Sequence, residues 1–285
     1  MKSTAPLTPQ PTADGSFTFY SEEFGEAFHS RQGARLEAEQ KFVVPTQIRQ
    51  KAAQGRLRLL DVCYGLGYNT AAALEATWQV NPHCRIEVIG LERSPSVPQT
   101  AIAENLLAGW NAPIPELLTQ IAHQPQVSGD RFQGQLLLGD ARQTIQQVSR
   151  HWADAIFLDP FSPQSCPELW TLEFLGQVVR CLKPSGHLAT YSCAAAVRTA
   201  LLTCGLQVGS TPGVGRKSPG TVAGFTATGL PLTLQEQEHL HTRAAVPYRD
   251  PTLTAIATAI RQQRQQEQAT CELESTSQWR RRWLR

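Results

Sequence analysis

Four acidic residues stand at the carboxyl ends of four successive stretches that have the composition of buried strands. The four are Asp61, Glu92, Asp140 and Asp159. In a doubly wound α/β sheet, ligands bind at the carboxyl ends of the parallel strands, so these carboxylates are expected to share one crevice. Carboxylates at one sheet edge repel one another unless a ligand or hydrogen-bond donors intervene. The pattern therefore predicts a ligand that carries positive charge and several donors, although a purely structural role for the acids is the alternative.

S-adenosylmethionine meets this requirement, because it has a sulfonium ion, an amino group, a ribose diol and an adenine amine. Glu92 is expected to accept hydrogen bonds from the ribose hydroxyls. Asp140 is expected to accept from the adenine amine, with the backbone of Ala141 beside it. Asp61 is expected to orient the methionine moiety, directly or through water.

A glycine-containing turn, Cys63-Tyr64-Gly65-Leu66-Gly67-Tyr68, follows the first of these acids. Gly65 and Gly67 permit a tight turn and a close approach of the backbone to a ligand. Asn69 and Thr70 are able to cap a helix that starts at Ala71. Thr70 stands where a dinucleotide fingerprint has its third glycine, so the turn does not indicate NAD. We assign Gly65, Gly67 and Asn69 to cofactor binding.

The loop after the fourth predicted strand begins at Asp159, our candidate catalytic residue, and reads Asp-Pro-Phe-Ser-Pro. Methyl transfer from a sulfonium requires a neutral nucleophile, and an alkylamine is only about 1 in 10³ neutral at pH 7. A carboxylate that accepts a hydrogen bond from the amine, together with desolvation, helps to supply the reactive form. Phe161 is expected to shield the methyl group or to stack on a planar base. The alternative for this loop is a turn that the prolines make rigid.

Strands and helices alternate from residue 56 onward, which predicts an α/β fold. The last two of the seven predicted strands follow one another without a helix. This indicates a class I, Rossmann-like fold with a seven-stranded, mostly parallel sheet, helices on both faces and one antiparallel edge strand. Residues 108–133 are expected to form an insertion near the rim of the site. The predicted strands are 56–60, 85–92, 135–140, 153–159, 187–192, 206–210 and 221–227.

Composition limits the possible functions. The 285 residues carry a net charge of +2, so a nucleic-acid partner would have to bind a local patch. The seven cysteines have irregular spacing and no Cys-x-x-Cys pair, which argues against a disulfide framework and against a metal site. The sequence has no signal region and no apolar run of about 20 residues. We therefore expect a cytoplasmic location and no membrane span.

The chain divides into three predicted parts: a leader and substrate-side lid at 1–54, a methyltransferase domain at 55–229, and a polar helical tail at 230–285. The lid holds three candidate substrate contacts, Tyr20, Glu26 and His29, for which ordinary core, cap or surface roles are the alternatives. The tail is either a solvated helix or a phosphate contact.

Arg216 and Lys217 lie between glycines and form a compact cationic loop. They are predicted to contact a phosphate or the anticodon loop of an RNA substrate. A solvated turn is the alternative.

Several motifs together resemble the methyltransferase module of the MnmC family, the tRNA 5-methylaminomethyl-2-thiouridine biosynthesis enzymes. The resemblance runs from about residue 17 to residue 227, and its motifs lie at 60–69, 157–163, 167–170 and 213–217. It implies a methyltransferase that uses S-adenosylmethionine and acts on the aminomethyl group of the wobble uridine in the anticodon region of tRNA. Asp159 matches the acid in the family's Leu-Asp-Gly-Phe-Ala-Pro loop, in which Pro160 here replaces the glycine and Ser162 the alanine.

Bifunctional members of this family also carry an FAD-dependent oxidoreductase module. The residues after Leu230 contain no G-x-G-x-x-G motif, so we expect a stand-alone methyltransferase and a separate enzyme that supplies the aminomethyl intermediate. Two other functions stay open. A methyltransferase of the same fold could act on a small amine or a protein side chain, which the weak basicity and Pro160 favour. A non-catalytic nucleotide-binding module is the other.

Overall fold

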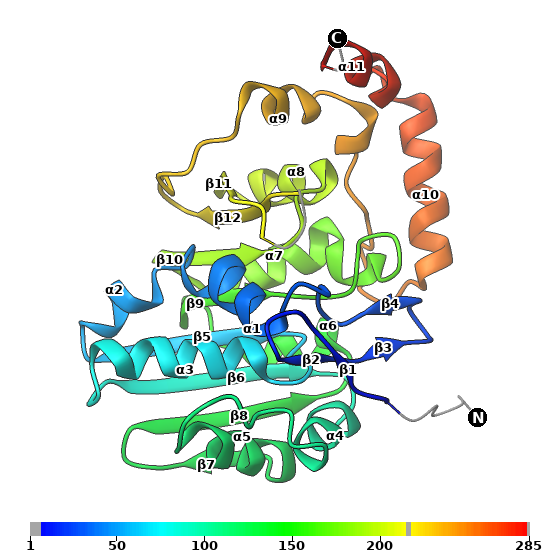
Figure 1. Cartoon of the computed structure of the whole chain (residues 1–285). Helices are drawn as coiled ribbons and strands as arrows, with labels where there is room; N and C mark the ends of the chain where they lie inside the picture. Colours follow the sequence, from blue (N-terminus) through cyan, green and yellow to red (C-terminus); the bar gives the residue numbers. More distant parts are fainter. Residues whose placement is uncertain (1–6, 215–217, 284–285) are drawn as a thin grey trace.

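An eight-stranded sheet forms the centre of the molecule, with the strand order β11-β12-β10-β9-β5-β6-β8-β7 (Figure 1). The computed structural model describes residues 7–214 and 218–283. Strands β10, β9, β5, β6 and β8 are parallel, whereas β12 runs antiparallel to β10 and β11, and β7 runs antiparallel to β8. The bounds of the sheet strands are β5 (Arg56–Val62), β6 (Arg85–Glu92), β7 (Gln126–Ser128), β8 (Phe132–Leu138), β9 (Ala153–Leu158), β10 (Leu182–Thr190), β11 (Gln207–Thr211) and β12 (Gly220–Gly224).

The predicted α/β class is confirmed, but the number and placement of the outer strands differ from the prediction. The extra strand, β7, comes from the insertion at 108–133 and is only three residues long, which is too short for a period of two to show. The antiparallel strand β12 lies one strand in from the edge, between β10 and β11. The insertion packs on the sheet through α5 (Ile114–His123), and none of its residues lines the cavity described below.

Helices cover both faces of the sheet because alternate side chains of each strand point to opposite sides. In β5, Leu57 and Leu59 belong to one buried cluster, and Leu60 and Val62 belong to the other. The first face carries α1 (Ala34–Glu37), the π-helical segment Ala38–Val43, α2 (Ile48–Ala52), α3 (Tyr68–Val80), α4 (Ser96–Ala103) and α5. The second face carries α6 (Ala141–Thr144), α7 (Leu172–Cys181) and α8 (Ala195–Thr203).

The turn after β5 has glycine at two positions with left-handed backbone. Gly65 and Gly67 have φ of +57° and +84°, and a Cβ on Gly67 would lie 2.7 Å from the hydroxyl oxygen of Tyr64. Gly67 caps α3, which begins at Tyr68 rather than at Ala71. Asn69 and Thr70 therefore lie inside the first turn of the helix. The prediction that they cap the helix is wrong.

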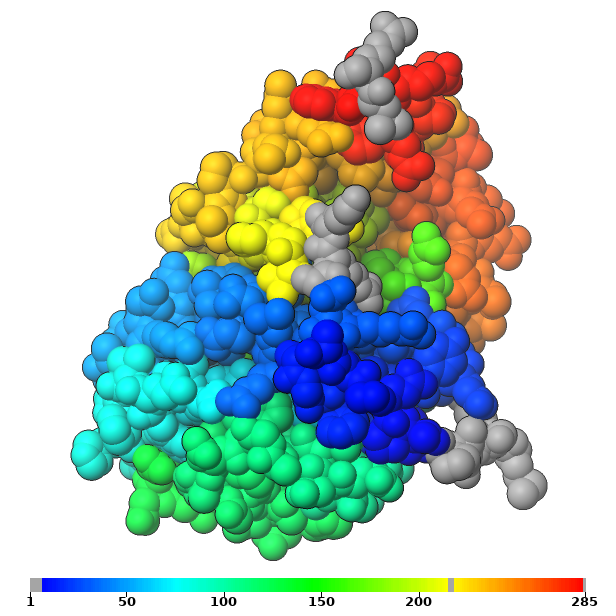
Figure 2. Space-filling model, viewed as in Figure 1, coloured from blue at the N-terminus to red at the C-terminus, as the bar shows by residue number. Residues whose placement is uncertain are grey.

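Two short hairpins precede the sheet. They are formed by β1 (Gln10–Pro11) with β2 (Phe17–Thr18) and by β3 (Tyr20–Ser21) with β4 (Glu26–Ala27). In the space-filling view the N-terminal residues (dark blue) lie across the middle of the molecule (Figure 2).

The C-terminal segment is packed on the sheet domain over part of its length. Tyr248, Asp250 and Ile260 are buried. Its helices are α9 (Leu234–His239), the 3₁₀ turn Arg243–Ala245, α10 (Ala257–Thr270) and α11 (Thr276–Trp283). Two other 3₁₀ turns, Ile145–Gln147 and Pro167–Trp170, lie in the sheet domain. Among the described residues, no helix has both the length and the apolar character to cross a membrane.

Arg198 joins α8, β11, β12 and α9 in the interior. Its guanidinium donates to Glu236 Oε1 (2.8 Å), Thr221 Oγ1 (2.9 Å) and the Gly220 carbonyl (3.0 Å). Ser210 Oγ donates to the same Glu236 oxygen (2.6 Å). The Arg198 side chain is only 3% exposed, so its removal leaves a largely buried carboxylate without its ion-pair partner and a buried carbonyl without this donor.

We predict that Arg198→Ala lowers the free energy of unfolding by about 3–5 kcal/mol, because breaking a buried ion pair leaves an uncompensated charge. Urea unfolding followed by circular dichroism measures the change. The matched control is Arg56→Ala. The Arg56 side chain is 60% exposed and pairs with Glu87, so its removal should lower the free energy of unfolding by about 0–1 kcal/mol. Equal losses of unfolding free energy in the two variants would contradict a special stabilising role for the buried Arg198 ion pair.

Candidate active site

A cavity of about 1120 Å³ opens at the carboxyl ends of β5, β6, β8 and β9. The strand order reverses here, since β6 and β8 follow on one side of β5 and β9 and β10 on the other, and such a switch point is the usual ligand site of an open α/β sheet. Most of the predicted site residues line it: Tyr20, Glu26, His29, Gly65, Asn69, Glu92, Asp140, Ala141, Asp159 and Phe161. Asp61 and Gly67 do not line it, and Arg216 and Lys217 lie outside the described residues.

Asp61 lies beneath the cavity rather than in it. Its side chain shares the face of β5 that α3 covers, and its Oδ2 accepts a hydrogen bond from Thr70 Oγ1 (2.7 Å). Burial raises the pKa of Asp61 to about 7, which the Thr70 hydrogen bond opposes and the nearby charge of Glu92 reinforces. Its buried Oδ1 has no hydrogen-bond partner within the described part of the chain.

Glu92 closes the glycine turn onto the end of β6. Its two carboxylate oxygens accept from the backbone amides of Gly65 (2.9 Å) and Ser94 (3.0 Å). Burial raises the pKa of Glu92, and the same backbone amides act against that rise. The turn and the acid are therefore held as one unit at the cavity wall.

Asp159 and Asn69 meet across the switch point. Asn69 Nδ2 donates to Asp159 Oδ2 (2.8 Å), and the backbone amide of Asp159 donates to the Val62 carbonyl (3.1 Å). The position of Asn69 in the first turn of α3 makes this contact possible, because a side chain there faces the end of the neighbouring strand β9.

The loop after Asp159 is fixed from behind by two large side chains. Trp170 Nε1 donates to the Phe161 carbonyl (2.8 Å), and the Tyr191 hydroxyl donates to the Pro160 carbonyl (2.9 Å). Trp170 is fully buried. These bonds hold the ring of Phe161 at the cavity.

The β3–β4 hairpin is bonded to the same loop. Glu26 accepts hydrogen bonds from the amide and hydroxyl of Ser162 and from the Ser165 hydroxyl (2.6 Å). Phe24 stacks on Phe161 with ring centroids 4.4 Å apart, and Phe28 meets Phe161 edge to face at 5.0 Å. Three aromatic rings thus form one wall of the cavity.

His29 is a buried residue of this lid. Its Nδ1 lies 3.3 Å from Thr18 Oγ1, and its ring stacks on Tyr68 at 5.3 Å. Burial lowers the pKa of His29 to about 4, although the charge of Asp14 acts in the opposite direction. The imidazole is therefore neutral at physiological pH. Tyr20 is 44% exposed and lines the outer part of the cavity.

Asp140 ends the β8 side of the cavity and caps α6. Its Oδ1 accepts from the backbone amide of Arg142 (2.9 Å), and Ala141 lines the cavity beside it. Burial would raise the pKa of Asp140, but the hydrogen bonds and charge of Arg142 outweigh it and hold that pKa below its usual range.

Sequence reasoning missed several lining residues. Tyr64 is buried against Gly67 and Gly90, and Arg93 lies over the Phe24 ring (5.3 Å) while it pairs with Glu23. Tyr64 precedes the first turn glycine and Arg93 follows the second acid, so proximity to the motifs was the available signal. Phe24 lies between the predicted lid residues Tyr20 and Glu26, and Arg142 directly follows Ala141, so the same signal was available for them.

The cavity suits a cationic cofactor with several donors. Its lining includes eight carboxylates and two guanidinium groups, and the glycine turn lets backbone approach its interior. No group of three or more His, Cys, Asp or Glu residues within 7–214 and 218–283 is arranged to hold a metal ion. All seven cysteines are free thiols.

Comparison with known proteins agrees with this geometry. Residues 99–225 match the family described as S-adenosyl-L-methionine-dependent methyltransferase. The crystal structure of MnmC2 from Aquifex aeolicus superposes with a TM-score of 0.83 at 37% sequence identity, covering 95% of this chain and 87% of that chain.

Two relatives found by sequence extend the comparison. An uncharacterized protein of Methanocaldococcus jannaschii is 30% identical over 264 residues, which are 90% of this chain and 70% of that protein. The bifunctional tRNA 5-methylaminomethyl-2-thiouridine biosynthesis protein MnmC of Methylibium petroleiphilum is 31% identical over 85% of this chain, which spans only 38% of that protein. The chain therefore belongs to the family of S-adenosyl-L-methionine-dependent methyltransferases that contains MnmC2 and the methyltransferase module of MnmC.

Proposed function

We propose that the chain methylates the aminomethyl nitrogen of the wobble uridine in tRNA, converting 5-aminomethyl-(2-thio)uridine to 5-methylaminomethyl-(2-thio)uridine. The observation that carries this proposal is Asp159, held by Asn69 at the switch point of the sheet and facing a cavity with an aromatic wall. The substrate is suggested by the names of the MnmC relatives, which refer to this nucleoside.

The cofactor half of the cavity is proposed to bind through the strand-end acids. When bound, S-adenosylmethionine supplies a methyl group on a positively charged sulfur. Glu92 would accept from the ribose hydroxyls and Asp140 from the adenine amine, while the backbone of Gly65 would approach the ligand. Asn69 acts through Asp159, which it holds in place. Asp61, beneath the cavity, would act on the methionine moiety through a bridging water.

Asp159 is proposed to select the reactive form of the acceptor. Its carboxylate would accept a hydrogen bond from the neutral amine and keep the nitrogen lone pair directed at the methyl carbon. When the methyl group moves from the cofactor's sulfur to the nitrogen, positive charge would pass to the nitrogen, and the Asp159 carboxylate would stabilise it. Asn69 keeps the carboxylate oriented. Close and aligned reactants supply most of the acceleration.

The aromatic wall is proposed to hold the pyrimidine ring. Stacking of a base on an aromatic side chain is worth about 1–3 kcal/mol and does not depend strongly on base identity. Phe161 is two residues after Asp159, and the ring of Phe24 stacks on the ring of Phe161. Tyr20, Glu26 and neutral His29 would line the entry of the nucleotide.

Two features bear on the competing functions. Pro160, in place of the family's glycine, leaves open a small amine or a protein side chain as the acceptor, and a non-catalytic nucleotide-binding module is the second alternative.

A tRNA substrate would need a local cationic surface, to which we assign Arg216 and Lys217 as phosphate contacts. The reaction also requires another enzyme that first produces the primary amine. A tRNA substrate agrees with the cytoplasmic location that the sequence predicts.

We predict that the protein transfers tritiated methyl from S-adenosylmethionine to tRNA that carries the unmethylated aminomethyl group, and that Asp159→Asn lowers kcat about 10²–10⁴-fold. Isothermal titration calorimetry should show cofactor affinity within a few-fold of the wild type. Label in small amines alone would reject the tRNA substrate. A loss of cofactor affinity equal to the loss of rate would assign Asp159 to cofactor binding, and an unchanged rate would reject a catalytic role.

We predict that Glu92→Gln weakens cofactor binding about 10- to 100-fold, because hydrogen bonds to a charged group are worth about 1.5–3 kcal/mol. Calorimetric titration with S-adenosylhomocysteine measures it. Glu87→Gln, on the same strand but paired with Arg56 and Arg58, is the control and should bind normally. Normal binding by Glu92→Gln would exclude the ribose assignment.

We predict that His29 makes the folded state less stable in acid. Because its folded pKa is about 4 and its unfolded pKa about 6.5, its contribution is complete above pH 6.5 and is lost as the pH falls toward 4. Asp61, with a raised pKa of about 7, acts in the opposite sense, since stability then falls as the pH rises between about 4 and 7. The difference between wild type and variant therefore isolates His29.

Urea unfolding of the wild type and His29→Gln at pH 4.5, 5.5, 6.5 and 7.5 tests this prediction. The wild-type protein should lose up to about 3 kcal/mol more than the variant across this range. His83→Gln, at an exposed position, should follow the wild-type curve. Parallel curves for the wild type and His29→Gln would show that His29 is accessible to protons in the folded state.

A further inference from the structure

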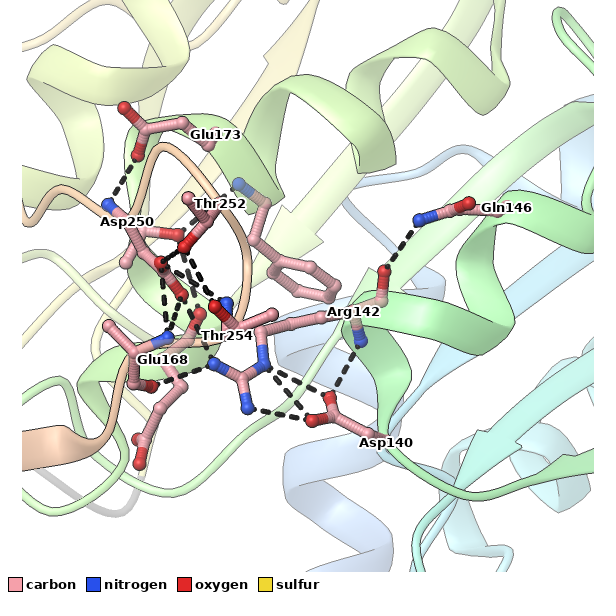
Figure 3. Close-up of polar contacts among 11 residues, drawn as sticks. Asp140, Arg142, Gln146, Glu168, Glu173, Asp250, Thr252 and Thr254 are labelled. Atoms are coloured by element: carbon pink, nitrogen blue, oxygen red, sulfur yellow. Dashed lines mark hydrogen bonds and ion pairs between the residues drawn. The ribbon is translucent and has the colours of Figure 1, made fainter.

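A buried acid of the C-terminal segment is connected to the cavity through one arginine. Asp250 is fully buried, and its Oδ2 accepts from Arg142 Nη1 at 3.1 Å (Figure 3). The same guanidinium nitrogen donates to the Ala255 carbonyl at 2.9 Å. Asp250 itself does not line the cavity, whereas Arg142 does. A residue more than 100 positions along the chain thus contacts the side chain that meets Asp140.

The other nitrogens of the planar Arg142 guanidinium donate to the carboxylate of Asp140. Its Nε lies 3.1 Å from both carboxylate oxygens of Asp140, and its Nη2 donates to Oδ2 at 2.7 Å. The side chain of Arg142 is 13% exposed and that of Asp140 is 35% exposed, so only the acid keeps a substantial accessible surface. A rigid guanidinium fork fixes the plane of the carboxylate as well as its position.

Asp250 is itself held firmly. Its Oδ1 accepts from the backbone amides of Thr254 and Ala255 at 3.2 Å, and its own amide donates to Glu173 Oε2 at 2.7 Å. Figure 3 shows the turn around Asp250 beside the Arg142 guanidinium. The acid is therefore a fixed point against which Arg142 can be positioned.

The arrangement also sets the charge at this side of the cavity. Arg142 with Asp140 alone would be a neutral pair, and its guanidinium could leave the carboxylate. With Asp250 the three groups together carry one negative charge, and the arginine is held from both sides. Asp140 then presents an ionised, oriented carboxylate to the cavity.

We propose that Asp250 is a positioning residue for the cofactor, which acts through Arg142 to aim the Asp140 carboxylate at the amine of the adenine ring. This inference rests on the proposed contact between Asp140 and that amine, and not on the identity of the methyl acceptor. It makes the C-terminal segment part of the cofactor site, although the segment itself lies outside the sheet.

The test is a double-mutant cycle read by calorimetric binding of two ligands. One ligand is S-adenosylhomocysteine, and the other is S-inosylhomocysteine, in which a 6-oxo group replaces the adenine amine. Asp250→Asn should weaken binding of the first about tenfold and of the second much less, so that the discrimination falls at least fivefold. In an Asp140→Asn background, Asp250→Asn should have no further effect, because coupled residues are non-additive.

Glu173→Gln is the matched control, since it removes an anchor of the same segment without touching the Asp140 fork. It should lower Tm and leave the discrimination unchanged. Arg142→Lys keeps the charge but loses the fork, and it should reproduce the loss of discrimination even if Asp250→Asn does not fold.

Three results would overturn the proposal. Asp250→Asn could weaken both ligands equally, its effect could add in full to that of Asp140→Asn, or Asp140→Asn could leave the discrimination intact. No methyl acceptor enters these titrations, so failure of the tRNA proposal and failure of this one are separate outcomes.

Discussion

Mutual repulsion among the acids at one sheet edge is the constraint on which the site depends. Each acid has its own donor or donors, and α3 supplies two of them. Thr70 and Asn69, both in the first turn of α3, donate to Asp61 and Asp159 respectively. Backbone amides hold the acid of β6, and a guanidinium holds the acid after β8. The fold therefore holds four acids at one sheet edge, and three of them, Glu92, Asp140 and Asp159, line the cavity.

The acids are not equivalent, because burial and donors differ among them. Asp61 is fully buried with one hydroxyl donor, and its pKa rises to about 7. Asp140 is partly exposed beside a guanidinium, and its pKa falls. Negative charge is thus favoured at the Asp140 side of the cavity and disfavoured beneath the glycine turn. A cationic ligand that approaches the turn would favour ionisation of Asp61, so the protonation of this residue and cofactor binding are expected to be linked.

The sequence predicts well what depends on local pattern and poorly what depends on direction or distance along the chain. The alternating elements and the glycine turn follow from periodicity and backbone conformation. The direction of Asp61 does not, because a strand-end acid can face either side of the sheet. Capping rules placed Asn69 at the start of α3, but Gly67 with its positive φ takes that place. The role of Asp250 cannot be inferred locally, since its partner Arg142 lies 108 residues away in the sequence.

The two halves of the cavity are built from different kinds of element, and this bears on specificity. The glycine turn and the strand-end acids belong to the sheet, and enzymes with unrelated acceptors can share such a sheet. The aromatic wall and Glu26 come instead from the N-terminal hairpin and the loop after β9. Under the proposed function, the choice of acceptor resides in segments outside the sheet. The C-terminal segment contacts both halves, since Asp250 holds Arg142 at one side and Arg261 donates to the Gln164 carbonyl (2.8 Å) at the other. Under the proposed function, a change in that segment would alter cofactor and acceptor binding together without contact with either ligand.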